Sequence, residues 1–252
     1  MEACGRTGRG LGARLKPLVI AHRGASAERP ENTLSAYALA VEQRADMIEI
    51  DLHRTRDGGV VITHEEELGG LGGEGAIEDA LLADVRALDA GGGEPVPTLD
   101  EVLDGFGERI PFNLELKRGV RALYDGLEAM ALDAVRDRGL LAKTLFSSFF
   151  DPVLEQLRAL ESAARIAFLC SPRDAHHPLE RARAVGAEAL NPWQGMVTRE
   201  LVDTAHAEGL AVYPFTVDDP ERMRQLLEWG VDGLFTNCPG RMRRLVGHQA
   251  GS

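Results

Sequence analysis

Acidic side chains alternate with apolar ones in two short segments of the chain, 47–53 and 112–117. Such strict alternation is typical of a β-strand, in which successive side chains point to opposite faces. Each segment therefore predicts a strand with one apolar and one polar face. The polar faces carry Glu49, Asp51 and His53 in the first segment and Asn113, Glu115 and Lys117 in the second.

Three of these side chains, Glu49, Asp51 and Glu115, would converge if both strands turned their polar faces into the lumen of a barrel. Carboxylates that share a low-dielectric site cannot all stay ionised by themselves, because repulsion and desolvation raise their pKa values. A divalent cation resolves this conflict, and an all-oxygen ligand set favours Mg2+, Ca2+ or Mn2+ over zinc. The alternative is a structural salt-bridge network in which Lys117 and Arg23 balance the acids.

Two histidines, His22 and His64, each end a predicted strand. His22 is followed by Arg23 and Gly24, a guanidinium that can hold a phosphate beside a residue that lets a ligand approach the backbone. Two imidazoles near a cation and an arginine suit in-line displacement at phosphorus. One imidazole takes a proton from the nucleophile and the other gives one to the leaving alcohol. The sequence does not assign these two roles.

Short apolar runs alternate with amphipathic helical patterns through most of the chain. The predicted strands are Leu18–His22, Met47–His53, Val60–His64, Pro111–Lys117, Thr144–Phe149, Arg165–Cys170, Ala187–Asn191, Ala211–Val217 and Asp232–Thr236. The predicted helices are Asn32–Ala45, Val120–Arg138, Pro152–Ser162, Pro178–Val185, Thr198–Glu208 and Pro220–Trp229. This order predicts a parallel sheet built from βαβ units.

An open doubly wound sheet and a closed TIM-type (β/α)8 barrel both fit this order. No G-x-G-x-x-G follows the first strand, as it would in a dinucleotide-binding fold. Nine predicted strands are one too many for a barrel, but the turn at Asp57–Gly59 is too short for a crossover helix. That turn therefore marks a local irregularity. We predict the barrel, with the active site at the C-terminal ends of its strands.

The segment 65–108 interrupts the barrel pattern with a glycine-rich, acidic stretch. It holds 13 Asp and Glu residues and a single Arg, so it accounts for the whole formal charge of −12. Loops of this size are usually functional. We expect an insertion at the barrel mouth, after the strand that ends at His64. The barrel would span 17–247 and follow a flexible N-terminal tail, 1–16.

Composition excludes several other classes of function. A chain of 252 residues with a net charge of −12 has no broad basic face for nucleic acid or an anionic membrane surface. No segment approaches the roughly 18 apolar residues of a membrane span, so we expect no stable membrane insertion. Three cysteines without C-x-x-C spacing indicate a reducing compartment, and we expect a cytoplasmic protein. The sequence leaves the oligomeric state open.

Several stretches of the chain together resemble the glycerophosphodiester phosphodiesterase family. They are His22-Arg23-Gly24, Pro30-Glu31-Asn32-Thr33, Glu49-Ile50-Asp51, Thr55-Arg56-Asp57-Gly58, His64, Pro97–Leu103 and Asn113–Lys117. Their order and spacing agree over about the first half of the chain, and later segments fit more weakly. The resemblance implies a TIM-type barrel that hydrolyses small glycerophosphodiesters to sn-glycerol 3-phosphate and an alcohol. It also implies a divalent cation held by Glu49, Asp51 and Glu115, with His22 and His64 as acid and base.

Further residues are expected around this site. Arg23 would bind the phosphoryl oxygens, and Lys117 would add positive charge beside them. The family usually has His-Asp where this chain has His64-Glu65, and Trp-Thr-Val where it has Phe215-Thr216-Val217. Glu65 keeps a carboxylate with a longer reach, so we expect activity to survive. The expected neighbours of the site are His53, Glu65, Trp193 and Phe215.

Two other functions remain open at this point. One is a non-catalytic barrel that binds phosphodiesters, which the change to Glu65 and the unusual insertion would suit. The other is a metal-dependent lyase or isomerase with Lys117 as its base, although this leaves His22 and His64 without a role. If the chain is a phosphodiesterase, an acidic rim on the insertion would favour cationic alcohols such as choline.

Overall fold

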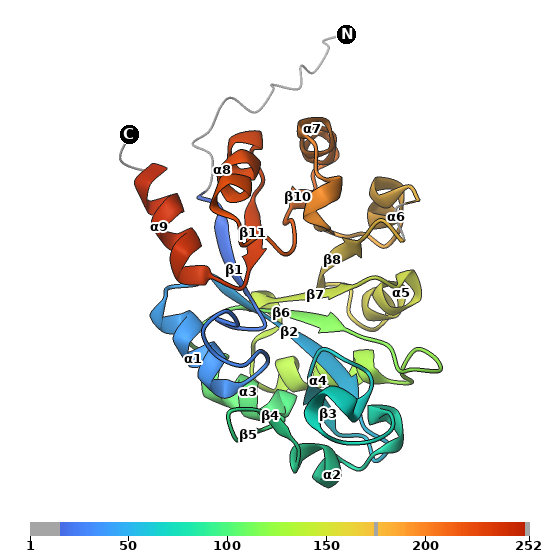
Figure 1. Cartoon of the computed structure of the whole chain (residues 1–252). Helices are drawn as coiled ribbons and strands as arrows, with labels where there is room; N and C mark the ends of the chain where they lie inside the picture. The colour runs from blue at the N-terminus through green and yellow to red at the C-terminus, as the bar shows by residue number, and fades with distance from the viewer. Residues whose placement is uncertain (1–15, 174–175, 250–252) are drawn as a thin grey trace.

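Parallel strands surrounded by helices dominate the computed structural model, which describes residues 16–173 and 176–249 (Figure 1). The strands are β1 (Leu18–His22), β2 (Met47–Arg54), β3 (Val60–Ile62), β4 (Asp89–Gly91), β5 (Glu94–Pro95), β6 (Phe112–Leu116), β7 (Thr144–Ser148), β8 (Arg165–Cys170), β9 (Ala189–Pro192), β10 (Ala211–Val212) and β11 (Gly233–Thr236). The α-helices are α1 (Leu34–Glu42), α2 (Leu82–Arg86), α3 (Leu99–Phe106), α4 (Leu127–Asp137), α5 (Asp151–Leu160), α6 (Pro178–Ala184), α7 (Arg199–Ala207), α8 (Pro220–Trp229) and α9 (Pro239–Gln249). The short 3-10 helices are η1 (Leu68–Leu71), η2 (Ile77–Asp79), η3 (Leu141–Lys143) and η4 (Gln194–Met196).

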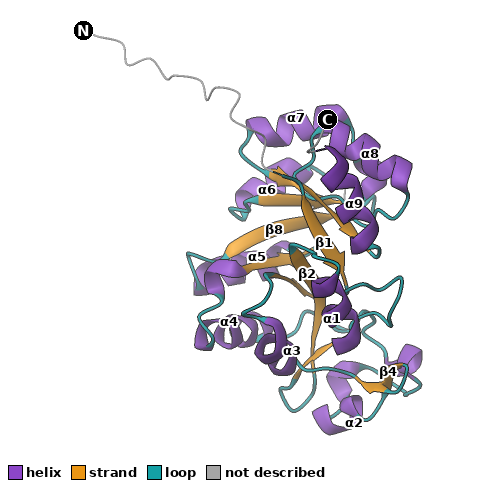
Figure 2. Ribbon diagram, turned by 90° about the vertical axis from the view of Figure 1, so that its left-hand side faces the viewer, coloured by secondary structure: helices purple, strands orange, loops and turns teal. Residues whose placement is uncertain are grey.

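Eight of the described strands run parallel in the order β10-β9-β8-β7-β6-β2-β1-β11. Backbone hydrogen bonds join the two ends of this series, since Asp232 N–H donates to Val212 at 3.0 Å and Phe235 N–H donates to Pro214 at 3.0 Å. The series therefore closes into a ring with the helices outside it (Figure 2). The predicted TIM-type barrel is confirmed.

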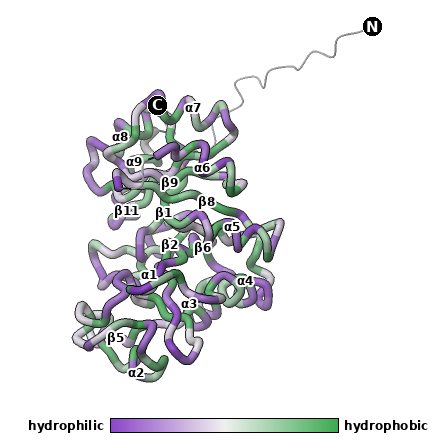
Figure 3. Tube along the Cα trace, turned by 90° about the vertical axis from the view of Figure 1, so that its right-hand side faces the viewer, coloured by the Kyte–Doolittle hydropathy of each residue, from purple (hydrophilic) through white to green (hydrophobic). Residues whose placement is uncertain are grey.

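Two layers of apolar side chains hold the barrel together. The larger layer lies between the strands and the outer helices, and the helices change between hydrophilic and hydrophobic residues along their length (Figure 3). The smaller layer packs inside the lumen and consists of Ile20, Met47, Leu145, Ala167, Ala189, Tyr213 and Phe235. Four of them, Ile20, Met47, Leu145 and Ala189, each lie two residues before a polar residue of the same strand, namely His22, Glu49, Ser147 and Asn191. The apolar filling thus ends before the C-terminal strand ends, where polar residues take over.

The predicted irregularity after β2 is an antiparallel strand. β3 turns back at Gly58 and pairs with the end of β2, with Leu52 opposite Ile62. Gly58 has a φ of +88°, which a residue with a side chain rarely adopts. Because β3 lies outside the parallel series, the extra strand does not disturb the closure of the barrel.

The insertion after β3 is shorter than predicted. Residues 65–97 form a small unit with its own apolar cluster, which includes Leu68, Ile77 and Val85. The last part of the predicted segment is instead α3, a barrel helix that packs into the main core through Leu99, Val102, Leu103 and Phe106. The spacing of these residues is that of an amphipathic helix. The acidic residues on its outer face obscured this pattern in a segment dominated by glycine and acids.

Other element boundaries also differ from the prediction. The helix expected from Val120 starts only at Leu127, because Gly126 at its N-cap has a φ of +77°. The strand expected over Ala211–Val217 keeps only two residues, and Pro214 follows it without an N–H to offer. The helix α9 was not predicted. The predicted tail falls almost wholly outside the described residues, and no helix among the described residues is long and apolar enough to cross a membrane.

Candidate active site and metal centre

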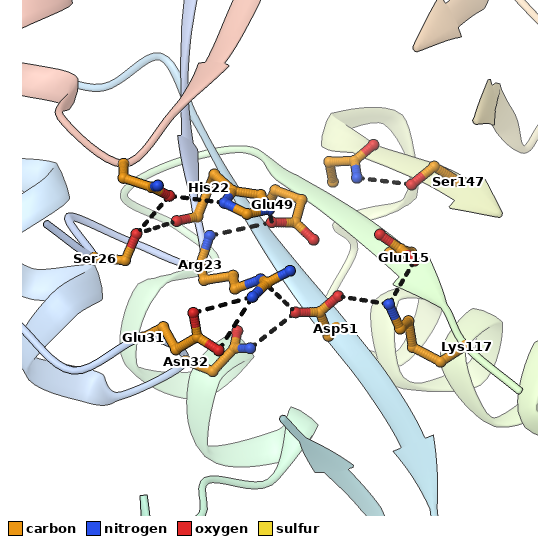
Figure 4. A network of polar contacts seen from close by, with 12 residues as sticks. His22, Arg23, Ser26, Glu31, Asn32, Glu49, Asp51, Glu115, Lys117 and Ser147 are labelled. Atoms are coloured by element: carbon orange, nitrogen blue, oxygen red, sulfur yellow. Dashed lines mark hydrogen bonds and ion pairs between the residues drawn. The ribbon is translucent and has the colours of Figure 1, made fainter. Parts of the chain in front are cut away.

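A cavity of about 320 Å³ opens at the C-terminal ends of the barrel strands. Most of the predicted site residues line it, and Figure 4 shows the polar contacts of His22, Arg23, Glu49, Glu115 and Lys117 among them. The lining residues are His22, Arg23, Glu49, His64, Asn113, Glu115, Lys117, Phe149, Leu169, Trp193, Phe215, Thr216 and Phe235. The structure therefore brings together residues from both halves of the sequence.

The three predicted carboxylates meet because β2 and β6 are neighbours. Asp51 pairs in register with Glu115, and Glu49 lies two residues earlier on the inward face of β2. One oxygen atom from each of the three carboxylates lies within 4.8 Å of the others. Glu49 and Asp51 are buried and Glu115 is nearly so. This arrangement matches a single small site for a divalent cation.

Hydrogen-bonding partners are distributed unequally among these carboxylates. Asp51 accepts a hydrogen bond from the amide of Asn32 at 2.9 Å, and it forms ion pairs with the guanidinium of Arg23 at 3.0 Å and the ammonium group of Lys117 at 3.4 Å. Glu115 pairs with Lys117 at 2.9 Å. Glu49 accepts only a backbone N–H, from Arg23, on its Oε2 atom, and its buried Oε1 atom has no partner. Part of the salt-bridge network considered from the sequence is thus present, but it leaves Glu49 unbalanced.

The pKa values follow this distribution. Burial, together with the charges of Asp51 and Glu115, raises the pKa of Glu49 well above its ordinary value. Burial also raises the pKa of Glu115, although Lys117 opposes the change. Burial acts the same way on Asp51, but Lys117 and Arg23 outweigh it and lower its pKa. Glu49 and Glu115 therefore bind a proton more readily than exposed glutamates do, and a cation bound between them would oppose this.

The donor set fits a hard divalent cation. All candidate ligand atoms are carboxylate oxygens, and two oxygens of these groups, Glu49 Oε1 and Asp51 Oδ1, are buried without a hydrogen-bond partner. Glu31 also pairs with Arg23, at 3.0 Å. The four carboxylates of this described cluster, with Glu31 included, carry a charge of −4 when ionised, and Arg23 and Lys117 together carry +2. The remaining charge of −2 is the charge that a divalent cation would neutralise.

Lys117 is held in its charged form. Burial opposes this, but the carboxylates of Glu115 and Asp51 raise its pKa above the usual value. A lysine base would need the opposite shift. The geometry therefore argues against a lyase or isomerase in which Lys117 removes a proton.

The turn after β1 directs Arg23 back toward the carboxylates. Arg23 has a φ of +57° and Gly24 a φ of +86°, so the chain reverses within two residues. A side chain at position 24 would also clash with the backbone of Ala36, because a Cβ atom there would lie 2.7 Å from its carbonyl carbon. This is the physical reason for the glycine in the sequence His-Arg-Gly at this turn.

The segment Pro30-Glu31-Asn32-Thr33 supports the same carboxylates. Asn32 has a φ of +56°, and its side-chain amide nitrogen donates to Asp51. Its side-chain amide oxygen accepts a hydrogen bond from the hydroxyl of buried Tyr37 at 3.1 Å. Thr33 caps the N-terminus of α1 by accepting from the backbone N–H of Ala36. The motif thus both caps the first turn of α1 and orients the carboxylate of Asp51.

His22 has a fixed tautomer. Its Nδ1 atom lies 2.8 Å from Asn237 Oδ1, and the amide nitrogen of Asn237 donates to Asp218 at 2.7 Å. Because the amide nitrogen is used by the carboxylate, the amide oxygen faces His22 and Nδ1 must donate. The lone pair on Nε2 then faces the cavity, 4.0 Å from Glu49. Burial and the charge of Arg23 lower the pKa of His22 to about 4, so the ring is neutral at pH 7.

His64 lines the same cavity and lies two residues after the end of β3. Its Nδ1 atom lies 2.8 Å from the carboxylate of Glu65, which leaves Nε2 available to a ligand. His64 also lines a second cavity of about 160 Å³ together with Glu67 and Leu71 of the insertion. Glu65 therefore contacts His64 as the sequence suggested, and the insertion borders the mouth.

Aromatic side chains form the remaining wall. Phe149 and Phe215 meet edge to face with ring centroids 5.9 Å apart, and Trp193 lies at the rim with 43% of its surface exposed. His53, in contrast, does not line the cavity. It is fully buried and contacts the hydroxyl of Tyr124 at 2.8 Å and the backbone carbonyl of His64 at 3.4 Å.

Sequence reasoning missed the residues that orient the site. Ser26, Asn32, Asp218 and Asn237 carry hydrogen bonds to site residues or to their partners, and none was assigned a role. Asn32 stood within a quoted motif, so its match was a usable signal. Asn237 lies 215 residues from His22, and only the closure of the barrel brings them together.

Comparisons with known proteins agree with this geometry. Residues 22–241 match the model of the "Glycerophosphoryl diester phosphodiesterase family". A glycerophosphodiester phosphodiesterase of Caldanaerobacter subterraneus is 34% identical over 243 residues, which cover 92% of this chain and 98% of that protein. One of Bacillus subtilis is 34% identical over 88% of this chain and 84% of its own length.

A solved structure extends the likeness to three dimensions. The structure of a phosphodiesterase of Oleispira antarctica, in complex with the product sn-glycerol-3-phosphate, superposes with a TM-score of 0.81 at 30% identity. The superposition covers 92% of this chain and 97% of that protein. The chain therefore belongs to the glycerophosphoryl diester phosphodiesterase family of enzymes.

Proposed function

We propose that this enzyme hydrolyses glycerophosphodiesters to sn-glycerol 3-phosphate and an alcohol, with His22 and His64 as general base and acid. One observation carries the proposal: two histidines with oriented rings border a cavity in which buried carboxylates converge beside Arg23. The product complex of the Oleispira antarctica relative supports the same substrate class.

Glu49, Asp51 and Glu115 would hold the divalent cation, and Mg2+, Ca2+ and Mn2+ all suit three carboxylates. When bound, the cation supplies positive charge that stabilises the phosphoryl oxygens in the transition state. Arg23 binds a phosphoryl oxygen in the same region. Lys117 keeps its charge and adds to the positive potential on that side of the cavity.

His22 is the base in this scheme. Its Nδ1–H is committed to Asn237, and the Nε2 lone pair is free and unprotonated at pH 7. Nε2 takes a proton from the attacking water as the oxygen–phosphorus bond forms. The hydrogen bond to Asn237 keeps the ring in place while it carries this proton.

His64 is the acid. The carboxylate of Glu65 accepts from Nδ1–H and orients the ring, so that Nε2 gives its proton to the leaving alcohol oxygen as the phosphorus–oxygen bond breaks. Exchange of one proton with solvent at each ring then restores both histidines. The chain thus keeps the function of the usual His-Asp pair with a longer carboxylate.

Addition of cations to metal-stripped protein tests this function. The full chain is treated with a chelator, mixed with glycerophosphocholine, glycerophosphoethanolamine or glycerophosphoinositol, and supplied with Mg2+, Ca2+ or Mn2+. We expect turnover only after a cation is added, and none with the Glu115→Gln variant. Tight binding of the diesters without turnover for every cation would instead indicate a non-catalytic barrel.

A further inference from the structure

Asn113 is a buried polar residue of the cavity to which the proposed chemistry assigns no role. It lies on β6, pairs in register with Glu49 and is 1% exposed. Its amide nitrogen donates to Ser147 at 2.8 Å, and its amide oxygen has no hydrogen-bond partner. Since buried polar atoms are almost always satisfied, this oxygen calls for a donor from outside the chain.

The chemistry of the cavity restricts what that donor can be. The described charged donors are directed elsewhere, since Arg23 and Lys117 contact carboxylates and His22 contacts Asn237. Phosphate oxygens only accept hydrogen bonds, so a phosphate group does not suit the amide oxygen. In a glycerophosphodiester the groups of the glycerol moiety that donate are its two hydroxyls.

The depth of Asn113 indicates which half of the substrate reaches it. Asn113 precedes Glu115 by two residues on β6, so its Cα atom lies about 7 Å further into the barrel. The open end of the cavity is marked instead by half-exposed Trp193. One of the two groups esterified to the phosphate therefore enters first and binds near Asn113. The other group lies at the open end of the cavity, toward solvent.

We propose that Asn113 recognises a hydroxyl of the glycerol moiety and so makes the enzyme selective for glycerol esters over other phosphodiesters. Ser147 holds the Asn113 amide by accepting its N–H, which leaves the oxygen toward the ligand. The inference rests on the proposed function for its substrate, and it adds the residue that distinguishes glycerol from a simple alcohol. The leaving alcohol then lies at the mouth, beside Trp193 and the insertion.

Calorimetric binding of product analogues tests this inference, with the same divalent cation present throughout. The ligands are sn-glycerol 3-phosphate, two analogues that each lack one hydroxyl (1,2-propanediol 1-phosphate and 1,3-propanediol phosphate), and inorganic phosphate. For the wild-type protein we expect the loss of one of the hydroxyls to weaken binding about 10- to 100-fold, because the amide oxygen is left unsatisfied.

The variant Asn113→Leu, of similar size, should bind all three organic phosphates with equal affinity. Its affinity for inorganic phosphate should stay within about twofold of wild type. Asn191→Leu is the matched control, since Asn191 is also buried with an unpartnered amide but does not line the cavity. This control should keep the wild-type preference. If the Leu variant does not fold, Ser147→Ala should reduce the preference by releasing the Asn113 amide.

Three results would overturn the inference. They are a wild-type protein without preference among the ligands, an Asn113→Leu variant that keeps the preference, and an equal loss of affinity for all ligands including phosphate. The last result would place Asn113 at the cation or the phosphate. The binding measurement needs no turnover, so a hydroxyl preference without hydrolysis would reject the proposed function alone, and hydrolysis without a preference would reject only this inference.

Discussion

Asn237 accepts a hydrogen bond from His22 Nδ1 at 2.8 Å, across the junction between the last barrel strand and the first. Asp218 in turn holds the amide of Asn237 in the orientation that presents its oxygen. This chain of contacts fixes where the proton of His22 lies. The orientation of the proposed general base therefore depends on residues at the far end of the sequence.

Replacement of Asn237 should reduce catalysis without loss of the fold. We expect Asn237→Ala to lower kcat by about 10- to 100-fold, because His22 then lacks the partner that sets its tautomer. Steady-state kinetics with circular dichroism checks this. Ser26→Ala is the comparison, since Ser26 donates to the same amide oxygen and to the backbone carbonyl of His22 but does not contact the ring, and it should lower kcat less than Asn237→Ala does. Equal effects of the two substitutions would contradict the assignment.

The His22 ring should stay neutral in mildly acidic solution. Its pKa is lowered to about 4 by burial and by Arg23, so protonation sets in only below about pH 5. Long-range 1H–15N spectra of the metal-free protein report the state of each ring nitrogen. They should show the Nδ1–H tautomer from pH 8 down to pH 5. A midpoint near 6.5, or a proton on Nε2, would be inconsistent with this site.

Cation binding should stabilise the protein more at high pH. The pKa values of Glu49 and Glu115 are higher in the folded protein than in the unfolded chain. At pH values above the pKa values of the unfolded chain, the folded protein therefore binds more protons than the unfolded chain does. The stability of the metal-free protein then falls as pH rises through that window. Asp51, with a lowered pKa, loses its contribution only at pH values below this window.

Thermal unfolding at pH 5 and pH 8, with and without Mn2+, measures this difference. The rise in Tm on cation addition should be larger at pH 8. Glu49→Gln should raise the Tm of the metal-free protein at pH 8 and shrink the cation effect, because it removes a buried carboxylate without a cationic partner. A cation effect that is independent of pH would show that these carboxylates do not hold the ion.

The rim of the mouth should favour cationic alcohols. Glu66 and Glu67 stand beside the proposed acid at His64, and Glu67 lines the second cavity. At low salt we expect faster hydrolysis of glycerophosphocholine than of glycerophosphoinositol. The double variant Glu66→Gln with Glu67→Gln should reduce this ratio severalfold, and added salt should do the same. Equal rates for the two substrates in the wild-type protein would argue against an acidic rim.

The acidic charge is divided differently from the expectation. Asp100 and Asp104 of α3 pair with Arg138 on the barrel exterior, and Glu101 pairs with Arg86. These acids do not belong to the rim. The acidic residues of the segment that line the cavity beside His64 are instead Glu65 and Glu67.

The barrel and most of the cavity could be predicted from local pattern. Alternation placed Glu49, Asp51 and Glu115 on inward faces, and repeated βαβ units placed both histidines at the same end. These features depend on residues close together in sequence. The segment 99–106 shows the limit of such reasoning, because its helical spacing was outweighed by the glycine and acid content around it.

The orientation of the site could not be predicted. The tautomer of His22 depends on Asn237, and the placement of Asp51 depends on Asn32 in a left-handed backbone conformation. Neither contact leaves a periodic pattern. His53 shows the same limit, because alternation places it on the inward face but only the structure shows it behind His64.

The identity of the bond that is cut tests the central claim most directly. Phosphorus NMR follows glycerophosphocholine with cation-loaded wild-type protein and with the variants His22→Ala and Glu115→Ala. We expect sn-glycerol 3-phosphate and choline from the wild type, and rates lower by at least about a hundredfold for each variant. Formation of phosphocholine and glycerol, or near-normal rates in both variants, would contradict the account.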